Sequence, residues 1–567
     1  MKRFFALFLF TIILAVAVSA AEKGITSKAD ILNVLWLPSN APWPGALPQA
    51  FRQKLLEGKN TQAVLGKNVF TLLDQLEGSF LPLVQRYPDR YQLLKERAAQ
   101  GLTARQAYNL VDLLGEDYFD GFGSIPGNAT LTFPEDHKPH FDFQTGWYFF
   151  AGNFNDLQGN SYGILCMFFR RALFPPYLAK RMGLSDLDNQ VVDVQFGVTL
   201  GDKKLHLQGH NALIAGSSGL VKYNTNPFLA QVGKNIMQSF RKDKLFPMKI
   251  HFKDPAIPLE VNLLLKESQP ILLQGDQGRA PAIYGLGSLY YSIPGIKAHG
   301  FINYQGQEKQ VAGVMWMDNQ WMAGIMPSGY AKNIFIRALA NSINGFSGQA
   351  REGWGWDWNE VQFEDGSEVT FSAMHSTYSE ILKNRGPNPP GRITRPIAAG
   401  KFVDPSGRAV DVSGEVTLTR WVLSPASRAW FPCQWEVAIP TVKLKFSLTP
   451  LVNNQLMYFA NASEYKEGAV AAHGSRDGKP IKGVGFAESV AYAGYDYYLK
   501  TKFAILGIND TPCNRELMMA KAPDFWLTVK SALFLSFFLI IILVIVIWLI
   551  MRWFKKRNNS SSVARGV

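Results

Sequence analysis

Between residues 125 and 495, short runs of apolar and aromatic residues alternate with turn sequences, and no other feature of the chain restricts its fold as strongly. Turn signals such as Glu364-Asp365-Gly366 and Arg476-Asp477-Gly478 separate the runs. Many short strands joined by tight turns are typical of antiparallel barrels and sandwiches. Because one barrel seldom needs about 370 residues, the pattern predicts two antiparallel barrels in tandem, over 125–350 and 351–510.

Within this region, residues 290–321 predict a β-hairpin. Two strand-like runs, 301–304 and 311–317, are joined by the turn Gln305-Gly306-Gln307. The hairpin ends on Asp318, which the sequence sets between Trp316 and Trp321. An acid in an aromatic setting is either a chemical group or a structural polar anchor, and the local sequence leaves both interpretations open.

Both ends of the chain carry membrane signals. Residues 1–21 combine a basic start, an apolar stretch and small residues near Ala20, which predicts a cleaved secretory signal peptide. Residues 531–551 are almost wholly apolar, and at ~1.5 Å per residue a helix of this length spans a bilayer. We therefore expect a transmembrane helix over 526–551.

A cluster of basic residues follows this helix, beginning at Arg552, and predicts a cytoplasmic tail over 552–567. The expected topology is single-pass, with the N-terminal bulk on the periplasmic or extracellular side. Residues 22–124 differ from the rest, since apolar residues there recur at helical spacing in segments such as 88–100 and 103–114. We expect a small helical region that packs on the barrels or docks an envelope protein partner.

Composition excludes several classes of function. Of the net charge of +13, two charges lie in the first three residues and five lie after residue 551, which leaves about +6 for the body and no case for nucleic acid. The three cysteines form no metal-binding spacing, and at most one disulfide is possible. Gly-x-Ser-x-Gly, P-loop and Rossmann patterns are missing from the sequence. We expect no metal and no cofactor.

Several motifs, taken in order, resemble those of the secreted lipocalin-like family of AttH and carotenoid 1,2-hydratase (hydroxyneurosporene synthase, CrtC). The resemblance covers roughly residues 137–495 and includes these pieces: His140 with Gly146-Trp147-Tyr148-Phe149, Phe168-Phe169-Arg170, Tyr290-Tyr291-Ser292-Ile293-Pro294, Trp316-Met317-Asp318-x-x-Trp321, Gly355-Trp356-Asp357-Trp358 and Gly485-Phe486-Ala487-Glu488. It implies two lipocalin-like barrels with a ligand site between or within them. Some family members add water to an isolated alkene of an isoprenoid chain.

Two departures from the family pattern remove acids or aromatic groups. Thr145 and Gly146 stand where the pattern has Glu and Trp, and Gln320 stands where it has Glu. Both departures weaken any mechanism that needs paired carboxylates.

Alkene hydration requires a general acid kept protonated in an apolar pocket, and aromatic faces that stabilise a cation. Asp318 is the candidate catalytic residue. The candidate ligand-binding residues are Trp316, Trp321, Tyr290, Tyr291, His140, Trp147, Trp356 and Asp357. Each also has a structural interpretation: Asp357 as a turn cap, and Glu467 and Glu488 as partners of Arg170 or Arg171.

Three functions remain open at this point. The first is a membrane-anchored module that binds a hydrophobic ligand, a lipid or an isoprenoid, outside the cytoplasm. The second is a cofactor-free hydro-lyase or hydrolase acting on such a ligand, with Asp318 as the acid. The third is an envelope scaffold whose helical region, residues 22–124, binds a partner protein.

Overall fold

The structure is a computed structural model. It describes residues 122–123, 125, 128–181, 184–254, 257–266, 269–280, 288–322, 354–376, 387–458, 464–519 and 525–563, with nine further positions between 92 and 113. The predicted signal peptide at 1–21 and most of the predicted helical region lie outside the described residues. The domain boundaries stay predictions.

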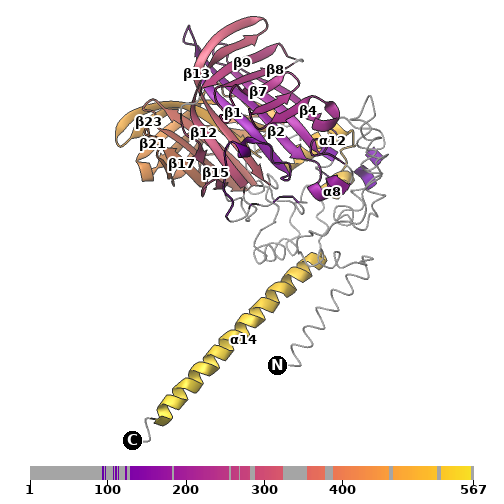
Figure 1. The fold of residues 1–567 in the computed structure, drawn as a ribbon, viewed down its shortest axis with the longest axis vertical. Helices are drawn as coiled ribbons and strands as arrows, with labels where there is room; N and C mark the ends of the chain where they lie inside the picture. Colours follow the sequence, from indigo (N-terminus) through magenta and orange to yellow (C-terminus); the bar gives the residue numbers. More distant parts are fainter. Residues whose placement is uncertain are drawn as a thin grey trace. The chain divides into compact units, whose positions relative to one another are not determined.

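The first of two antiparallel sheets carries the predicted hairpin near its centre (Figure 1). Its strand order is β4-β3-β2-β1-β13-β12-β9-β8-β7-β6-β5, and β10 and β11 also pair with β12. The strands are β1 (Thr145–Asp156), β2 (Ser161–Ala172), β3 (Gln190–Leu200), β4 (Leu205–Ile214), β5 (Val221–Asn224), β6 (Leu229–Val232), β7 (Asn235–Ser239), β8 (Met248–Lys253), β9 (Leu259–Lys266), β10 (Leu272–Leu273), β11 (Arg279–Ala280), β12 (Ser288–Tyr304) and β13 (Gln307–Met322).

The second sheet follows the first along the chain and is also antiparallel. Its order is β16-β19-β20-β21-β23-β24-β14-β15-β17-β18, with β22 paired to β23. The strands are β14 (Trp354–Phe363), β15 (Glu368–Ser376), β16 (Ile393–Pro396), β17 (Ala399–Val403), β18 (Ala409–Asp411), β19 (Glu415–Leu423), β20 (Trp430–Ile439), β21 (Leu444–Pro450), β22 (Leu456–Tyr458), β23 (Glu464–Arg476) and β24 (Lys479–Val490). Each sheet is curled into a half-barrel, which confirms the predicted mainly β, lipocalin-like fold class.

The hairpin of β12 and β13 turns where the sequence predicts. Gln305 and Gly306 both have positive φ, at 55° and 80°, as a two-residue type I′ turn requires. One irregularity follows the motif Tyr290–Pro294, where β12 carries one extra residue between Ile293 and Ile296. This β-bulge reverses the alternation of side chains along β12, so that Ile293 and Ile296 both point into the first core.

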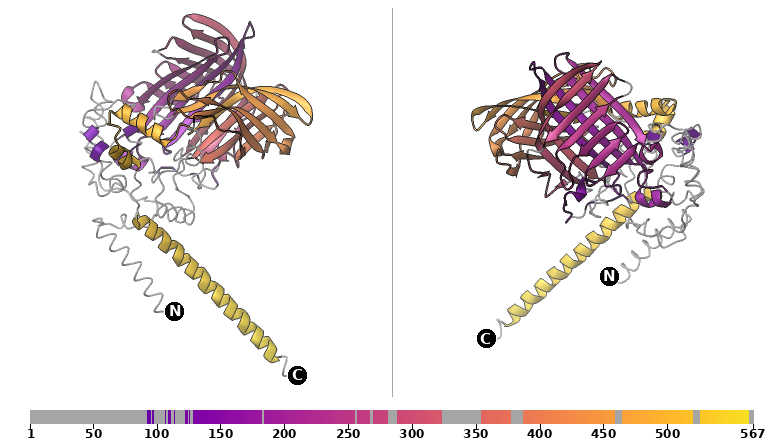
Figure 2. Two further views of the ribbon diagram at one scale, coloured as in Figure 1. Left: turned by 180° about the vertical axis from the view of Figure 1, so that it is seen from behind. Right: turned by 45° about the horizontal axis from the view of Figure 1, so that its top comes forward.

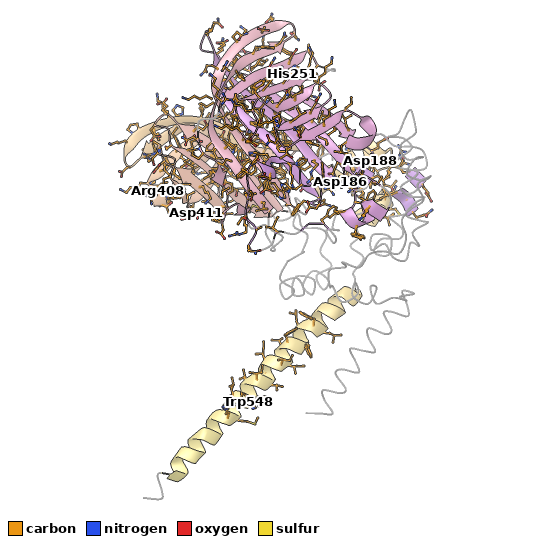
Figure 3. The ribbon with its side chains drawn as sticks, in the orientation of Figure 1. Asp186, Asp188, His251, Arg408, Asp411 and Trp548 are labelled. Carbon is orange, nitrogen blue, oxygen red and sulfur yellow. The ribbon has the colours of Figure 1, made fainter. Side chains whose placement is uncertain are left out.

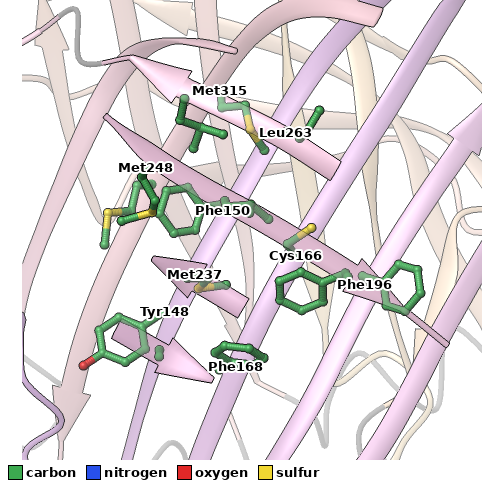
Figure 4. Close-up of a cluster of buried hydrophobic side chains, with 14 of the residues drawn as sticks. Tyr148, Phe150, Cys166, Phe168, Phe196, Met237, Met248, Leu263 and Met315 are labelled. Carbon is green, nitrogen blue, oxygen red and sulfur yellow. The ribbon is translucent and has the colours of Figure 1, made fainter. Parts of the chain in front are cut away.

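The interior of the first half-barrel is packed with side chains that alternate along its strands. Phe150 on β1, Phe168 on β2 and Met315 on β13 are nearly unexposed members of this core, and Figure 4 shows them with Met248 and Leu263. The second half-barrel has a separate core around Trp435, Phe431 and Leu448. Residues pointing away from the two cores are therefore free to form contacts between the sheets.

The two sheets contact each other through their outer faces, and we call this contact the inter-sheet interface (Figure 2). Gly163 leaves room for the second sheet, because a Cβ there would lie 2.5 Å from the Cβ of Ala469. The apolar part of the interface consists of Phe149, Ala151, Leu165, Met167 and Phe169 from the first sheet and Met457, Tyr465, Ala469, Phe486 and Val490 from the second.

Short helices lie outside the sheets. They are η2 (Glu135–His137), α8 (Pro176–Arg181), α9 (Ala215–Ser218), η3 (Pro440–Val442), α12 (Tyr495–Leu506) and α13 (Pro512–Met519). The described positions within the predicted helices 88–100 and 103–114 are helical. Gln106 donates from Nε2 to the carbonyl of Ile505 at 2.9 Å, and Lys502 Nζ donates to Asn109 Oδ1 at 3.1 Å. These bonds attach the N-terminal helical region to α12.

The helix α14 (Phe525–Val563) belongs to a separate unit of the chain. By length and composition, its residues from Leu533 to Arg552 could span a membrane, as predicted for 526–551. Its Trp548, labelled in Figure 3, is 51% exposed. Which side of a membrane each flank occupies stays a prediction.

Several charged residues outside the interface form contacts near the protein surface. His251 Nε2 lies 2.8 Å from Glu260 Oε1 on the first sheet, and Lys401 Nζ lies 2.6 Å from Asp411 Oδ1 on the second. Figure 3 labels His251 and Asp411. An exposed ion pair such as Lys443–Asp477, whose Nζ and Oδ1 lie 2.9 Å apart, contributes about 0–1 kcal/mol.

Candidate functional site

The pairing of β12 with β13 decides which side chains surround Asp318. Ser292 pairs with Asp318 and Tyr290 pairs with Gln320, so these four residues share one face of the hairpin. This face points to the second sheet, since Phe149, the β1 partner of Asp318, belongs to the inter-sheet interface. The sequence-based prediction therefore brings Tyr290, Trp316 and Asp318 together correctly.

Trp321 does not belong to this group, which corrects the predicted setting of Asp318 between two tryptophans. Residues an odd number apart on a strand point to opposite faces, and Trp321 lies three residues after Asp318. Its ring is packed in the core of the first half-barrel, together with Tyr291. The Oη atom of Tyr291 accepts from Asn319 Nδ2 at 3.1 Å and lies 2.7 Å from Nδ1 of His137.

Asp318 is buried and surrounded by hydrogen-bond donors. Tyr290 Oη donates to its Oδ2 at 2.7 Å, while Ser292 Oγ and Trp316 Nε1 donate to its Oδ1 at 2.5 Å and 2.7 Å. Burial nevertheless raises the pKa of Asp318 to about 6, because the three hydrogen bonds offset only part of the cost of desolvating the charge. A carboxyl group of this kind exchanges its proton near neutral pH.

The second sheet supplies the aromatic partners of this acid. Trp358 on β14 meets Trp316 edge to face, with ring centroids 6.5 Å apart, and meets Phe149 at 5.7 Å. Trp356 is on the same face of β14, and its Nε1 donates to Glu488 Oε2 at 2.8 Å. The residues around Asp318 thus come from both sheets.

Three further buried acids lie on the interface side of the second sheet: Glu360, Glu467 and Glu488. Burial raises the pKa of all three, that of Glu488 to about 7, and in each case the charge of Asp318 raises it further. Glu467 and Glu488 pair directly across β23 and β24. Unpaired buried acids are costly, and such clusters are more common at functional sites than elsewhere.

The sequence predicts Arg170 or Arg171 as the partner of Glu467 and Glu488; the pairing with Arg170 is wrong, and the pairing with Arg171 stays a prediction. Arg170 is directed to the interior side of the first sheet, where its Nη1 donates to the carbonyl of Phe143 at 2.9 Å and to Gln190 Oε1 at 2.7 Å. Because Arg170 and Phe169 are adjacent on β2, only Phe169 faces the second sheet.

Asp357 lies within the second half-barrel, on the opposite face of β14 from Trp356. It forms a buried ion pair with Arg395, with 2.5 Å between Nη1 and Oδ2, and accepts from Ser489 Oγ at 2.7 Å and from Tyr492 Oη at 2.9 Å. The structure thus separates Asp357 from Asp318, because neighbouring strand residues alternate between faces.

The remaining predicted residues lie at the end of β1. The ring of His140 stacks on that of Trp321, with centroids 3.8 Å apart, and burial lowers the pKa of His140 to about 4, so its imidazole is neutral at neutral pH. Trp147 packs beside the interface and stacks on Phe169 at 5.9 Å. Trp147 is one side-chain row from Asp318 on the interface face, since Trp147 pairs with Gln320 and Phe149 with Asp318, whereas His140 lies with Trp321 on the other face.

Sequence reasoning did not select Ser292, Trp358 or Glu360 as site residues. Ser292 and Trp358 stand inside the family-like motifs, and alternation along β14 places Trp358 and Glu360 on one face with Trp356. The alternation along β14 could therefore have identified Trp358 and Glu360 from the sequence. Among the described residues, no group of three or more His, Cys, Asp or Glu is arranged to hold a metal ion.

A pH-dependent prediction arises from Glu368 on β15, which is 4% exposed and accepts a backbone hydrogen bond from Gly295 of β12. Burial raises its pKa from 4.5 to about 8. The folded protein then keeps a proton that the unfolded chain has released. The contribution of Glu368 to stability is therefore complete below about pH 4.5 and lost as the pH rises to about 8.

Replacing Glu368 by glutamine, which is neutral at every pH, should remove this loss. Relative to wild type, the free energy of unfolding of Glu368→Gln is expected to rise by up to about 1.4 kcal/mol for each pH unit within that window. Urea unfolding between about pH 5 and pH 8 measures it. Glu415→Gln, at an exposed position of β19, is the control with a flat difference; a flat difference for Glu368→Gln would contradict the buried state of this carboxyl.

The family model of AttH-like proteins matches residues 125–492. Among solved structures, AttH from Nitrosomonas europaea is 22% identical, covering 65% of this chain and 100% of that chain with a TM-score of 0.49. Kievitone hydratase from Nectria haematococca is 14% identical, covering 66% of this chain and 98% of that chain with a TM-score of 0.45. CghA with Sch210972 is 12% identical, with coverages of 65% and 96% and a TM-score of 0.34. No curated protein matches the chain.

Proposed function

The chain belongs to the AttH-like family, and from this premise we propose that it binds a hydrophobic ligand, a lipid or an isoprenoid, at the inter-sheet interface and protonates it with Asp318. The observation that carries the proposal is the state of this acid. Asp318 is 4% exposed, lies beside the ring of Trp316, and has a pKa raised to about 6. Such a group can hold a proton away from water and deliver it at neutral pH.

The chemistry that fits this arrangement is cofactor-free addition of water to an alkene. Asp318 gives its proton to one alkene carbon, the other carbon becomes a cation, and water adds to it and releases a proton to a carboxylate. The rings of Trp316 and Trp358 are suited to stabilise the cation. Glu488, with its pKa raised to about 7, is a candidate for the proton acceptor.

A second function, ligand binding without chemistry, is favoured by one specific observation. Both oxygens of Asp318 already accept hydrogen bonds, from Tyr290, Ser292 and Trp316. A buried carboxylate whose two oxygens both accept hydrogen bonds is also what a structural anchor requires. Turnover of an identified ligand separates the two functions.

We place this activity outside the cytoplasm, with α14 as a single membrane anchor and the basic residues from Arg552 onward on the cytoplasmic side. The length and apolar composition of α14 support the anchor, and the basic flank supports the orientation. A protein partner for the helical region, residues 22–124, remains a further part of the proposal.

Native mass spectrometry of the full-length protein, released from its own membranes in nanodiscs, tests ligand binding. We expect a retained apolar molecule. Trp358→Ala, at the interface, should reduce its occupancy several-fold, whereas Trp430→Ala, beside the second core, should leave occupancy unchanged. Complete absence of a retained apolar molecule from wild type would argue against binding and catalysis together.

A further inference from the structure

Beside the interface, the end of β1 borders an open hollow of about 270 Å³, part of which is open solvent. The residues of its lining used below are Lys138, His140, Gly146, Trp147, Arg170 and Trp321. A Cβ at Gly146 would lie 3.2 Å from Nη2 of Arg170 and 3.2 Å from Cβ of Trp321, closer than ordinary contact. Glycine at this position, where the family pattern has tryptophan, therefore keeps space open next to the guanidinium group.

Within the described residues, no carboxylate forms an ion pair with the guanidinium group of Arg170, although the charge of Asp142 acts on it. It is 4% exposed, and its three hydrogen bonds go to neutral acceptors: the carbonyls of Phe143 and His140 and the side-chain amide of Gln190. Burial lowers the pKa of Arg170 to about 10, so it remains charged at neutral pH. A buried charge without an opposite charge is costly, and a bound anion would offset that cost.

A second unused donor lies in the same lining. Trp321 is 2% exposed, and its Nε1–H has no acceptor within the described part of the chain. Buried indole N–H groups usually have a partner. His140 stacks on this indole and is neutral, with Asp136 3.4 Å from its Nε2, while Lys138 is exposed at the rim. The hollow thus offers an anion three groups: the buried guanidinium of Arg170, the indole N–H of Trp321 and the exposed ammonium of Lys138.

We propose that this hollow binds the anionic head group of an amphipathic ligand, with the apolar chain passing Trp147 into the inter-sheet interface. This inference rests on the proposed function, which places the apolar part of the ligand in the inter-sheet interface. It adds that the other end of the ligand is an anion. Arg170 and Trp321 lie on the interior side of the first sheet and Trp147 and Gln320 on its interface side, and the hollow is lined by both pairs because it lies where β1 begins and β13 ends. A ligand held there by its head group would place its chain beside Trp147, one side-chain row from Phe149 and Asp318.

A carboxylate and a phosphate share the required chemistry, and matched ten-carbon probes distinguish them. Isothermal titration of the full-length protein in nanodiscs compares decanoate, decyl phosphate and decanol. We expect the better of the two anions to bind at least about tenfold more tightly than decanol, because hydrogen bonds to a charged group contribute enough binding free energy for that difference. The tighter anion identifies the head group.

Variants locate the contact. Arg170 also holds the carbonyls of His140 and Phe143, so its replacement affects folding, and the test depends on Lys138 and Trp321. Lys138→Glu and Trp321→Phe, which keeps an aromatic ring on His140, should each weaken anion binding several-fold and leave decanol binding unchanged. Lys445→Glu, on β21 of the second half-barrel, is the matched charge control and should change neither.

The outcomes separate this inference from the proposed function. Equal affinity of wild type for the anions and decanol, or no effect of Lys138→Glu and Trp321→Phe on the anions, would overturn the head-group site while the apolar-ligand function stands. No binding of any of the three probes would overturn both.

Discussion

Asp318→Asn is expected to reduce turnover of the ligand by about 100-fold or more, because an amide cannot supply the proton that general-acid catalysis contributes. The amide occupies nearly the same volume and can still accept from Ser292 and Trp316. The fold should therefore persist. Steady-state kinetics on the ligand found by mass spectrometry, with thermal unfolding measured in parallel, provides the test.

The pH dependence of wild-type turnover adds a second readout for the same acid. Since only protonated Asp318 can donate, the rate should fall as the pH rises above about 6. Tyr290→Phe removes a donor that favours the charged carboxylate, so it should raise the pKa of Asp318 and move this fall to higher pH. Unchanged turnover in Asp318→Asn would end the catalytic assignment, and loss of folding would instead identify a structural anchor.

Arg395→Met should lower the free energy of unfolding by about 3–5 kcal/mol, because it leaves the carboxylate of Asp357 buried without its counter-ion. Asp357 is unexposed, and Arg395 pairs with it from β16, the end strand of the sheet, which is not a hydrogen-bonded neighbour of β14. The substitution thus removes both a charge pair and a link between distant strands.

Chemical denaturation of Arg395→Met, Asp357→Leu and the double variant separates the pair from its surroundings. The double variant should regain most of the lost stability, since an apolar pair of similar volume is often as stable as a buried ion pair. Arg392→Met is the control: this arginine forms an exposed pair with Glu436 and should change stability little. Similar losses for Arg392→Met and Arg395→Met would contradict the importance of burial.

Local sequence patterns were sufficient to predict the secondary structure of this protein. The turn Gln305-Gly306, the alternating strands of both sheets and the apolar helix α14 all follow from short-range rules on φ, alternation and length. The family-like motifs also predicted that Tyr290, Trp316 and Asp318 lie together, because they occupy paired positions of one hairpin.

Contacts between the sheets could not be predicted in this way. Nothing in the periodicity of β14 says which strand of the first sheet its Trp358 meets, because the packing of one sheet on another depends on side chains throughout both faces. The misplacement of Trp321 has a different cause. The spacing of five residues between Trp316 and Trp321 already assigns them to opposite faces, and the motif drew attention to their proximity in sequence instead.

The extra residue in β12 lets this strand lose one residue without a change in the side chains that face Asp318, a property that matters for anyone who transplants or redesigns the hairpin. Tyr290 and Tyr291 are neighbours, yet one bonds to Asp318 and the other is packed in the first core. Deleting either Pro294 or Gly295 would remove the bulge and leave Ser292 opposite Asp318, whereas deleting both while the pairing from Ile296 to the turn is kept would bring Tyr291 opposite Asp318 in place of Ser292. Changes of length at the Gln305-Gly306 turn that lengthen or shorten both strands together also leave Ser292 opposite Asp318, so homologous hairpins of different overall length should keep this pair with or without the extra residue.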